Sequence, residues 1–209
     1  MGGENLIKTR LFFGPSFTCD LDWKNQFKIR IGPVLPASKE QISRSLRDLS
    51  AESIRNRFLG LKKEFSILEL DYLSNLDGWN HYAIGIEERE KPHRGIAIVR
   101  LVRSLLDPVE AEMAITIIDD YQGMGLGTFL MRLIVLAASE RKIERLSFTF
   151  LPQNEGIVKL IKHIGPHRTG SMTKDCVQAY IDLKDIDLEK IKSQLLPLLP
   201  LIDTFHLKT

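Results

Sequence analysis

The chain has 209 residues, of which 44% are apolar and 27% are charged, and its formal net charge is +2. These shares are close to those of soluble globular proteins and exclude a disordered, collagen-like or coiled-coil chain. The small charge excess gives no reason to expect nucleic acid or an anionic membrane as a partner. The two cysteines, Cys19 and Cys176, are far apart and the histidines form no HExxH motif, so we expect neither a disulfide framework nor a metal site.

The beginning of the chain lacks the basic stretch and apolar core of a signal peptide. No run approaches the ~18 consecutive apolar residues that span a bilayer. We therefore expect a cytoplasmic protein with no membrane partner.

Residues 1–26 mix glycine, proline and aromatic residues without a clear period. We expect an N-terminal arm here that lays Phe12, Phe13 and Trp23 on the body of the protein. Residues 27–183 show alternating strand and helix patterns and no internal repeat, which is typical of one α/β domain.

The body opens with a predicted strand from Phe27 to Ile31, where apolar and polar residues alternate. Helical spacing of apolar residues then predicts helices that start near Ser38 and Ser50, and a third over Phe65 to Leu76. The first part of the domain is therefore expected to run from a strand into helices.

Further along, the period changes back to two, and Tyr82–Ile86 and Gly95–Val102 are predicted to form a hairpin. Later elements are predicted from the same two periods. They are a strand at 111–118, a buried helix at 126–138, a strand at 145–151, a helix at 157–164 and a strand at 177–183.

Residues 184–209 form an apolar tail. Asp185 is expected to cap a helix there, and Pro197 and Pro200 are expected to end it. Because exposure of such an apolar segment to water is costly, we expect it to pack either on the domain or on a partner chain.

The most informative stretch runs from Ile117 to Thr128, where a predicted strand ends, three glycines follow and a long apolar helix begins. The first N–H groups of a helix are unpaired, and glycines let an anion approach the backbone closely, so we expect a phosphate-binding turn. A dinucleotide fingerprint counted from Gly123 would need glycine at position 128, and the Gly-Lys-Ser/Thr of a Walker loop is absent. The spacing therefore disfavours both nucleotide interpretations.

The pattern Gln122-x-x-Gly125-x-Gly127 resembles the acyl-CoA loop of the Gcn5-related N-acetyltransferases, the GNAT superfamily. The order of predicted elements over residues 27–183 is also similar to that of this superfamily. The resemblance implies an α/β (α+β) fold with a central mixed, mostly antiparallel sheet flanked by helices. It also implies acetyl-CoA as co-substrate, held in the splay between the central strands.

The resemblance further implies which residues contact the co-substrate. The pantetheine arm would pair with the strand, an oxyanion donor would lie near Ile117, and the pyrophosphate would lie in the turn. The implied contacts are Ile115, Thr116, Ile117, Gln122, Gly123, Met124, Gly125, Leu126, Gly127, Thr128 and, after the next strand, Asn154. By itself Asn154 is also a good helix N-cap.

Glu112 is the candidate general base. Strand alternation places it on the face opposite Met113, Ile115 and Ile117, and a carboxylate in an apolar strand is costly unless it is used or paired. Leu49-Ser-x-Glu-Ser53, Arg57-Phe58 and Ala111-Glu-Met-Ala resemble stretches of bacterial Pat-type protein lysine acetyltransferases, whose catalytic Glu matches Glu112. The alternative is that Glu112 is a solvated strand-end residue.

The expected function is direct acetyl transfer, in a ternary complex, to an amine that the Pat resemblance suggests is a protein lysine. Acetylation of a small amine and acyl-CoA sensing without turnover stay open as alternatives. Many GNAT enzymes have a tyrosine acid seven residues after the Asn, but Ile161 stands there. The thiolate would then take its proton from water or from another group. A homodimer is among the assemblies that the sequence leaves open.

Overall fold

The structure is a computed structural model that describes residues 12–62, 64–91 and 94–204. Within them, eight strands form one sheet in the order β1-β2-β3-β4-β5-β6-β8-β7. The strands are β1 (Cys19–Trp23), β2 (Phe27–Pro33), β3 (His81–Glu88), β4 (Gly95–Arg103), β5 (Glu110–Ile117), β6 (Arg145–Phe150), β7 (Arg168–Met172) and β8 (Val177–Asp182). The helices are α1 (Lys39–Arg47), α2 (Ala51–Phe58), α3 (Ile67–Ser74), α4 (Leu126–Glu140), α5 (Glu155–Ile164) and α6 (Leu188–Leu195).

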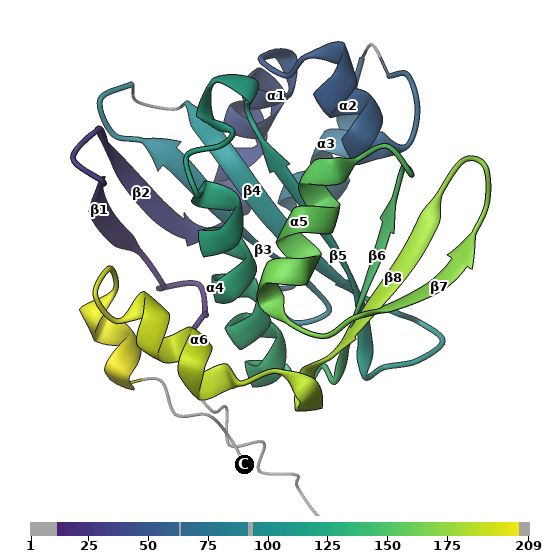
Figure 1. Ribbon diagram of the computed structural model, residues 1–209. Helices are drawn as coiled ribbons and strands as arrows, with labels where there is room; N and C mark the ends of the chain where they lie inside the picture. The colour runs from purple at the N-terminus through teal and green to yellow at the C-terminus, as the bar shows by residue number, and fades with distance from the viewer. Residues whose placement is uncertain (1–11, 63, 92–93, 205–209) are drawn as a thin grey trace, which may run out of the picture.

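The sheet has helices on both sides, with α4 and α5 in front of it and α1 and α3 behind it in Figure 1. Every neighbouring pair of strands is antiparallel except β5 and β6, which are parallel. The predicted mixed, mostly antiparallel α/β fold is therefore confirmed.

The two faces of the sheet carry side chains of different size. Toward α4, the cross-strand rows are large and apolar, as in Ile84, Val99 and Ile115, and α4 itself is buried along most of its length. Toward α1, the row that crosses four strands consists of Gly32, Gly85, Ile98 and Thr116. The main core therefore lies on the α4 side, and the α1 side is less densely filled.

The segment before the predicted domain contributes a strand to the sheet. β1 pairs with β2, with Trp23 opposite Phe27, and Phe13 and Trp23 are buried. β1 was missed because its alternation covers only Cys19, Leu21 and Trp23. β7 was missed because each of its residues is exposed and no hydrophobic period marks it.

The C-terminal segment lies against α4 (Figure 1), and Ile191, Leu195 and Leu199 are buried there. The N-cap of α6 is Asp187, two residues after the predicted cap, Asp185. Asp187 caps it by accepting a hydrogen bond from the Lys190 N–H at 2.8 Å. The expectation for Asp185 is wrong, because that residue ends a preceding 3-10 turn.

The ladder between β5 and β6 is short. It joins Glu110, Ala111 and Glu112 to residues 145–147, and beyond Glu112 the two strands separate. None of the helices that the structure describes is long and apolar enough to cross a membrane.

Candidate functional site

A cleft with a volume of about 660 Å³ opens where β5 and β6 separate. Its walls are residues 112–117 of β5 and 148–150 of β6, together with residues of α2, the turn before α4 and the first turn of α5. The fold thus brings together segments of chain from residue 52 to residue 160 around one elongated space.

The backbone of β5 offers hydrogen-bonding groups to this cleft. The Ile118 N–H donates to the Ile96 carbonyl across β4 at 2.9 Å. Because neighbouring residues of a strand point their backbone groups to opposite sides, Ile115 and Ile117 direct theirs toward β6, where the ladder has already ended. Thr116 pairs with Ile98 and directs its backbone groups to β4 instead.

The glycine turn has the backbone conformation that its sequence suggested. Gly123 and Gly125 have φ values of 74° and 90°, in the left-handed region that glycine adopts without strain. Gly125 is the N-cap of α4 and supplies no side chain, so the N–H groups of the first helical turn open toward the cleft. The turn is therefore suited to an anion, which the helix dipole also favours.

A lysine that sequence reasoning missed lies on this turn. The Lys24 ammonium and the Trp23 indole N–H both donate to the Met124 carbonyl, at 3.0 and 3.1 Å. Lys24 sits in the tight β1–β2 turn with a φ of 53° and is a hundred residues away in sequence. Only the pairing of β1 with β2 brings it there.

The turn is also tied to α2. Asp119 accepts hydrogen bonds from the Ser50 N–H, the Ser50 hydroxyl and the Ser53 hydroxyl, at 2.9, 2.6 and 2.9 Å. Gln122 donates to the Ser53 hydroxyl at 3.1 Å and to the Ile117 carbonyl at 3.0 Å. Burial acts to raise the pKa of Asp119, but the hydrogen bonds from Ser50 and Ser53 outweigh it and hold the pKa below its ordinary value. Ser50 and Ser53 therefore position the glycine turn.

Glu112 lies at the junction of the cleft and a smaller cavity. This second space, of about 270 Å³, is lined by α3 and the ends of β4 and β5, and we call it the α3 cavity. Glu112 is exposed to solvent, and Arg57 lines both spaces beside it. Burial lowers the pKa of the Arg57 guanidinium, and the negative charge of Glu112 partly opposes this shift.

Two further basic groups border the α3 cavity. The Arg100 guanidinium contacts His81 Nε2 and donates to the Leu73 carbonyl at 2.6 Å. Burial and, after it, the charge of Arg100 lower the pKa of His81 to about 4. His81 is therefore neutral at pH 7. Lys62 pairs with Glu69, and this bond together with the cap of Ser66 lowers the pKa of Glu69 to about 2.

Ten of the predicted site residues line the cleft. They are Glu112, Ile115, Thr116, Ile117, Gln122, Gly123, Gly125, Gly127, Thr128 and Asn154. The other two do not: Met124 uses its carbonyl for Trp23 and Lys24, and Leu126 is buried in the core. Asn154 is the N-cap of α5, with its side-chain oxygen accepting from the Ile157 N–H at 3.2 Å. Ile161 is buried.

No protein-family model matches the chain. It is 31% identical over 133 residues to acetyltransferase Pat of Mycolicibacterium smegmatis, a match that covers 64% of this chain and 39% of Pat. Its fold is similar to that of the GNAT domain of S. lividans PAT, with a TM-score of 0.71 at 22% identity over 79% of this chain and 96% of that domain. The chain therefore has the GNAT fold.

Two other acetyltransferases are also similar to this chain. Acetyltransferase PA5475 of Pseudomonas aeruginosa is 32% identical over 108 residues, which are 51% of this chain and 58% of that protein. The chain thus spans about 39 to 58% of the length of these curated relatives. A spermidine N-acetyltransferase of Vibrio cholerae, in complex with CoA and spermine, shares the fold with a TM-score of 0.57 at 15% identity, over 75% of this chain and 96% of that one.

Proposed function

We propose that this chain is an acyl-CoA-dependent N-acetyltransferase of the GNAT superfamily that uses acetyl-CoA and acetylates a lysine of a protein. The observation that carries the proposal is the cleft itself. It runs along the separated edge of β5, where Ile115 and Ile117 present backbone groups, to the glycine turn at the start of α4. An extended amide-containing arm that ends in a pyrophosphate matches this order of groups.

The turn would hold the pyrophosphate. Its N–H groups at Leu126, Gly127 and Thr128 are donors at a helix N-terminus, and Lys24 adds a positive charge beside them. Gln122 supports the turn rather than the phosphate, because its amide already donates to Ser53 and to the Ile117 carbonyl. Asn154 borders the same cleft and caps α5 there.

The thioester would lie near Ile115. Of the two residues whose N–H groups face the cleft, Ile115 is closer along β5 to Glu112 than Ile117 is, and the Ile117 carbonyl is engaged by Gln122. We therefore assign the oxyanion contact to the Ile115 N–H and a pantetheine contact to Ile117. This is a refinement of the sequence-based expectation, which set the donor near Ile117.

The reaction then requires few groups from the protein. The amine nitrogen bonds to the thioester carbon while Glu112 takes the proton that the amine loses, and the Ile115 N–H stabilises the oxyanion. Collapse of this intermediate breaks the carbon–sulfur bond and releases the CoA thiolate. Because Ile161 is buried and carries no proton donor, water supplies the proton to the thiolate, whose basicity resembles that of a thiol with a pKa of about 8.5, and the hydroxide left behind takes the proton that Glu112 holds.

A protein acceptor is favoured by the similarity to Pat and by the surface around Glu112. Leu61, Ile67 and Leu68 are strongly exposed, and Tyr72 links this apolar surface to the α3 cavity. Exposed apolar side chains that border a site are typical of a protein-binding surface. In this proposal the lysine side chain enters the α3 cavity, which Glu112 and Tyr72 both line.

Calorimetric titration with acetyl-CoA tests the co-substrate. We expect binding by the wild type and none by Gly125→Glu, whose side chain would fill the turn at a position 2.9 Å from the Lys24 ammonium. Gly78→Glu is the matched control, because Gly78 also has a left-handed φ, of 76°, and a side chain there meets open space. If circular dichroism shows that the wild type is folded and calorimetry shows that it binds no acetyl-CoA, the proposal is contradicted.

Radiolabelled acetyl-CoA then tests the acceptor. We expect label on proteins of a cell extract and not on spermidine, an aminoglycoside or free lysine. If only a small amine is labelled, the proposed transferase activity is correct and the proposed protein acceptor is wrong. Binding of acetyl-CoA without loss of the acetyl group to any amine would indicate a sensing module instead.

A further inference from the structure

A third space lies between α1 and the sheet, with a volume of about 230 Å³, and we call it the α1 cavity. Its floor includes Gly32 and Gly85, which are direct partners in the β2–β3 ladder, and Ala114 of β5. Residues this small leave room where a helix-covered sheet face normally carries branched apolar side chains. The cavity therefore results from the small residues on the face of the sheet that α1 covers.

Three of the polar side chains in its wall have hydrogen-bond partners. Gln41 donates to the Glu87 carboxylate at 2.8 Å, and the Ser45 hydroxyl donates to the Gly95 carbonyl at 2.8 Å. Arg100 donates to the Leu73 carbonyl at 2.6 Å. What remains open to an occupant is mainly the apolar surface of Val34, Ile42, Leu46, Leu49, Phe58, Ile96 and Ile98.

The α1 cavity continues from the cleft. Ala114 and Thr116 line both spaces, and so do Arg57 and Phe58 of α2. Ala114 and Thr116 flank Ile115, whose N–H we assign to the thioester oxygen. A chain attached to the thioester carbon would therefore start at the entrance to this cavity.

We propose that the α1 cavity receives the acyl chain of a co-substrate longer than acetyl-CoA, such as a thioester of a straight-chain fatty acid of about six carbons. This inference rests on the proposed function. The size follows from volume, since an apolar cavity of about 150 Å³ already accommodates the six carbons of benzene. A cavity of about 230 Å³ is larger than that.

The position of Glu112 favours the acyl chain over the acceptor as occupant. Glu112 lines the cleft and the α3 cavity but is not part of the α1 cavity wall. An amine that must give its proton to Glu112 approaches through the α3 cavity. The two substrates then occupy separate spaces that meet at Arg57, Phe58 and Ala114.

The test compares dissociation constants of acetyl-CoA and hexanoyl-CoA by calorimetry. Burial of one methylene group is worth a factor of about four in affinity, so four fully buried methylenes would tighten binding about 250-fold, and we expect partial burial to give at least about tenfold. Gly85→Leu would fill the floor of the cavity. A Cβ at Gly85 would lie 3.6 Å from Val34 Cγ2, an ordinary contact, and the backbone there is not left-handed.

We expect Gly85→Leu to weaken hexanoyl-CoA about tenfold more than it weakens acetyl-CoA. Gly60→Leu is the control for added bulk, because Gly60 faces open space outside all three cavities. Should Gly85→Leu fail to fold, a series of thioesters from acetyl to dodecanoyl with the wild type gives the same information. Affinity should rise with chain length up to the limit of the cavity and then stop rising.

Equal affinity of the wild type for acetyl-CoA and hexanoyl-CoA would overturn this inference and leave the proposed function intact. If the wild type binds neither acetyl-CoA nor hexanoyl-CoA, this inference and the proposed function are both overturned. If Gly85→Leu weakens the binding of hexylamine and not that of hexanoyl-CoA, the cavity belongs to the acceptor and the inference is wrong.

Discussion

Glu112 and Ser147 form the last pair of the β5–β6 ladder, so the proposed base stands at the point where the two central strands separate. Its carboxylate is exposed to the cleft on one side and to the α3 cavity on the other. The separation of the two strands thus places one ionisable group between the space proposed for the thioester and the space proposed for the amine.

Replacement of this carboxylate should remove the base and leave the cleft open. We expect Glu112→Gln to lower kcat/KM at neutral pH by about 100-fold or more, within the range that general-base catalysis contributes, while acetyl-CoA still binds. Steady-state kinetics and calorimetry measure the two effects. Glu110→Gln is the control, since Glu110 is two residues away and pairs with Arg145 at 3.4 Å. Full activity of Glu112→Gln would leave Glu112 without a catalytic role.

Lys24 should strengthen the binding of acyl-CoA through its charge. We expect Lys24→Ala to weaken acetyl-CoA binding about threefold to tenfold at low salt and by less in 0.5 M salt, because solvent ions screen an exposed lysine. Lys28→Ala, on the exposed face of β2, controls for the loss of one charge. An equal effect of the two substitutions, or one that salt does not change, would show that Lys24 does not contact the phosphates.

His81 should make the protein less stable in mild acid. Its pKa is about 4 in the folded protein and about 6.5 in an unfolded chain, so between these values only the unfolded state takes up a proton. The stability contribution is complete above pH 6.5 and falls as the pH drops to about 4, by roughly 1 kcal/mol after allowance for partial exposure. Urea unfolding of the wild type and His81→Gln across this range should show a flatter profile for the variant.

His163→Gln provides the comparison for this experiment, because His163 is exposed at the end of α5. It should retain the pH profile of the wild type. If His81→Gln and the wild type lose stability in parallel between pH 6.5 and 4, burial of His81 is not the cause of the loss.

Asp119 should stabilise the connection between α2 and the glycine turn. We expect Asp119→Asn to cost about 0.5–1 kcal/mol in unfolding free energy at pH 7, because it weakens three hydrogen bonds at a helix N-cap. The lowered pKa of Asp119 makes this contribution present above the ordinary carboxyl value of about 3.9 and lost as the pH falls below it. Thermal unfolding at pH 7 and pH 3 measures this. A difference that is as large at pH 3 would contradict an ionic origin.

The sequence predicted the parts of the fold and site that have local periods or local spacing. The glycine turn is recognisable because Gly123, Gly125 and Gly127 lie at the start of an apolar helical stripe. Gly123 and Gly125 adopt left-handed φ values, which glycine takes without strain. The hairpin of β3 and β4 and the buried helix α4 follow from periods of two and 3.6.

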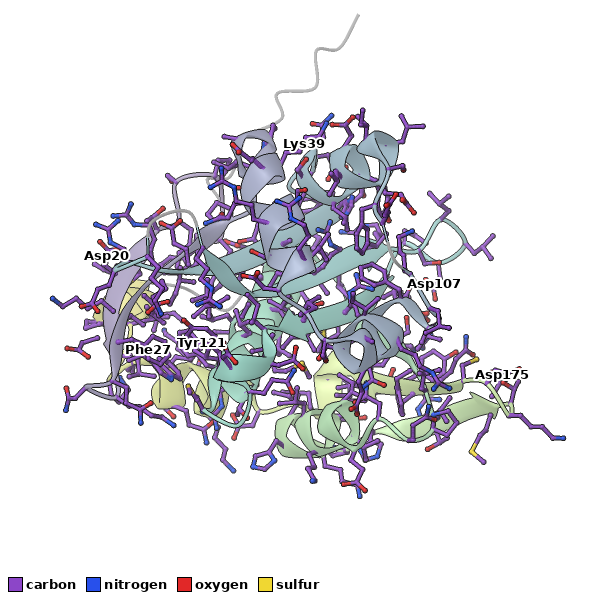
Figure 2. The ribbon with its side chains drawn as sticks, turned by 90° about the horizontal axis from the view of Figure 1, so that it is seen from above. Asp20, Phe27, Lys39, Asp107, Tyr121 and Asp175 are labelled. Carbon is purple, nitrogen blue, oxygen red and sulfur yellow. The ribbon has the colours of Figure 1, made fainter. Side chains whose placement is uncertain are left out.

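Contacts between segments that are distant in sequence could not be predicted, because no local pattern in the sequence indicates them. Lys24 reaches the turn because β1 pairs with β2, and the sequence of residues 19–23 only weakly indicates a strand. Near this place the ring of Phe27 in β2 contacts the ring of Tyr121, which lies just before the glycine turn (Figure 2). Ser50 and Ser53 look like ordinary helix-cap residues, and only the fold brings them to Asp119. The α1 cavity depends on Gly32 lying opposite Gly85, a register that neither strand encodes alone.

The bonds from Ser50 and Ser53 to Asp119 and Gln122 also have a consequence for the order of binding. α2 carries Arg57 and Phe58 beside the amine's route, while its first turn is fastened to the loop that would hold the nucleotide end of acyl-CoA. A ligand that orders the loop therefore also orders α2. We therefore expect positive cooperativity between the two proposed substrates, and thermodynamic reciprocity makes the factor by which the CoA thioester raises the affinity for the acceptor equal to the factor in the opposite direction.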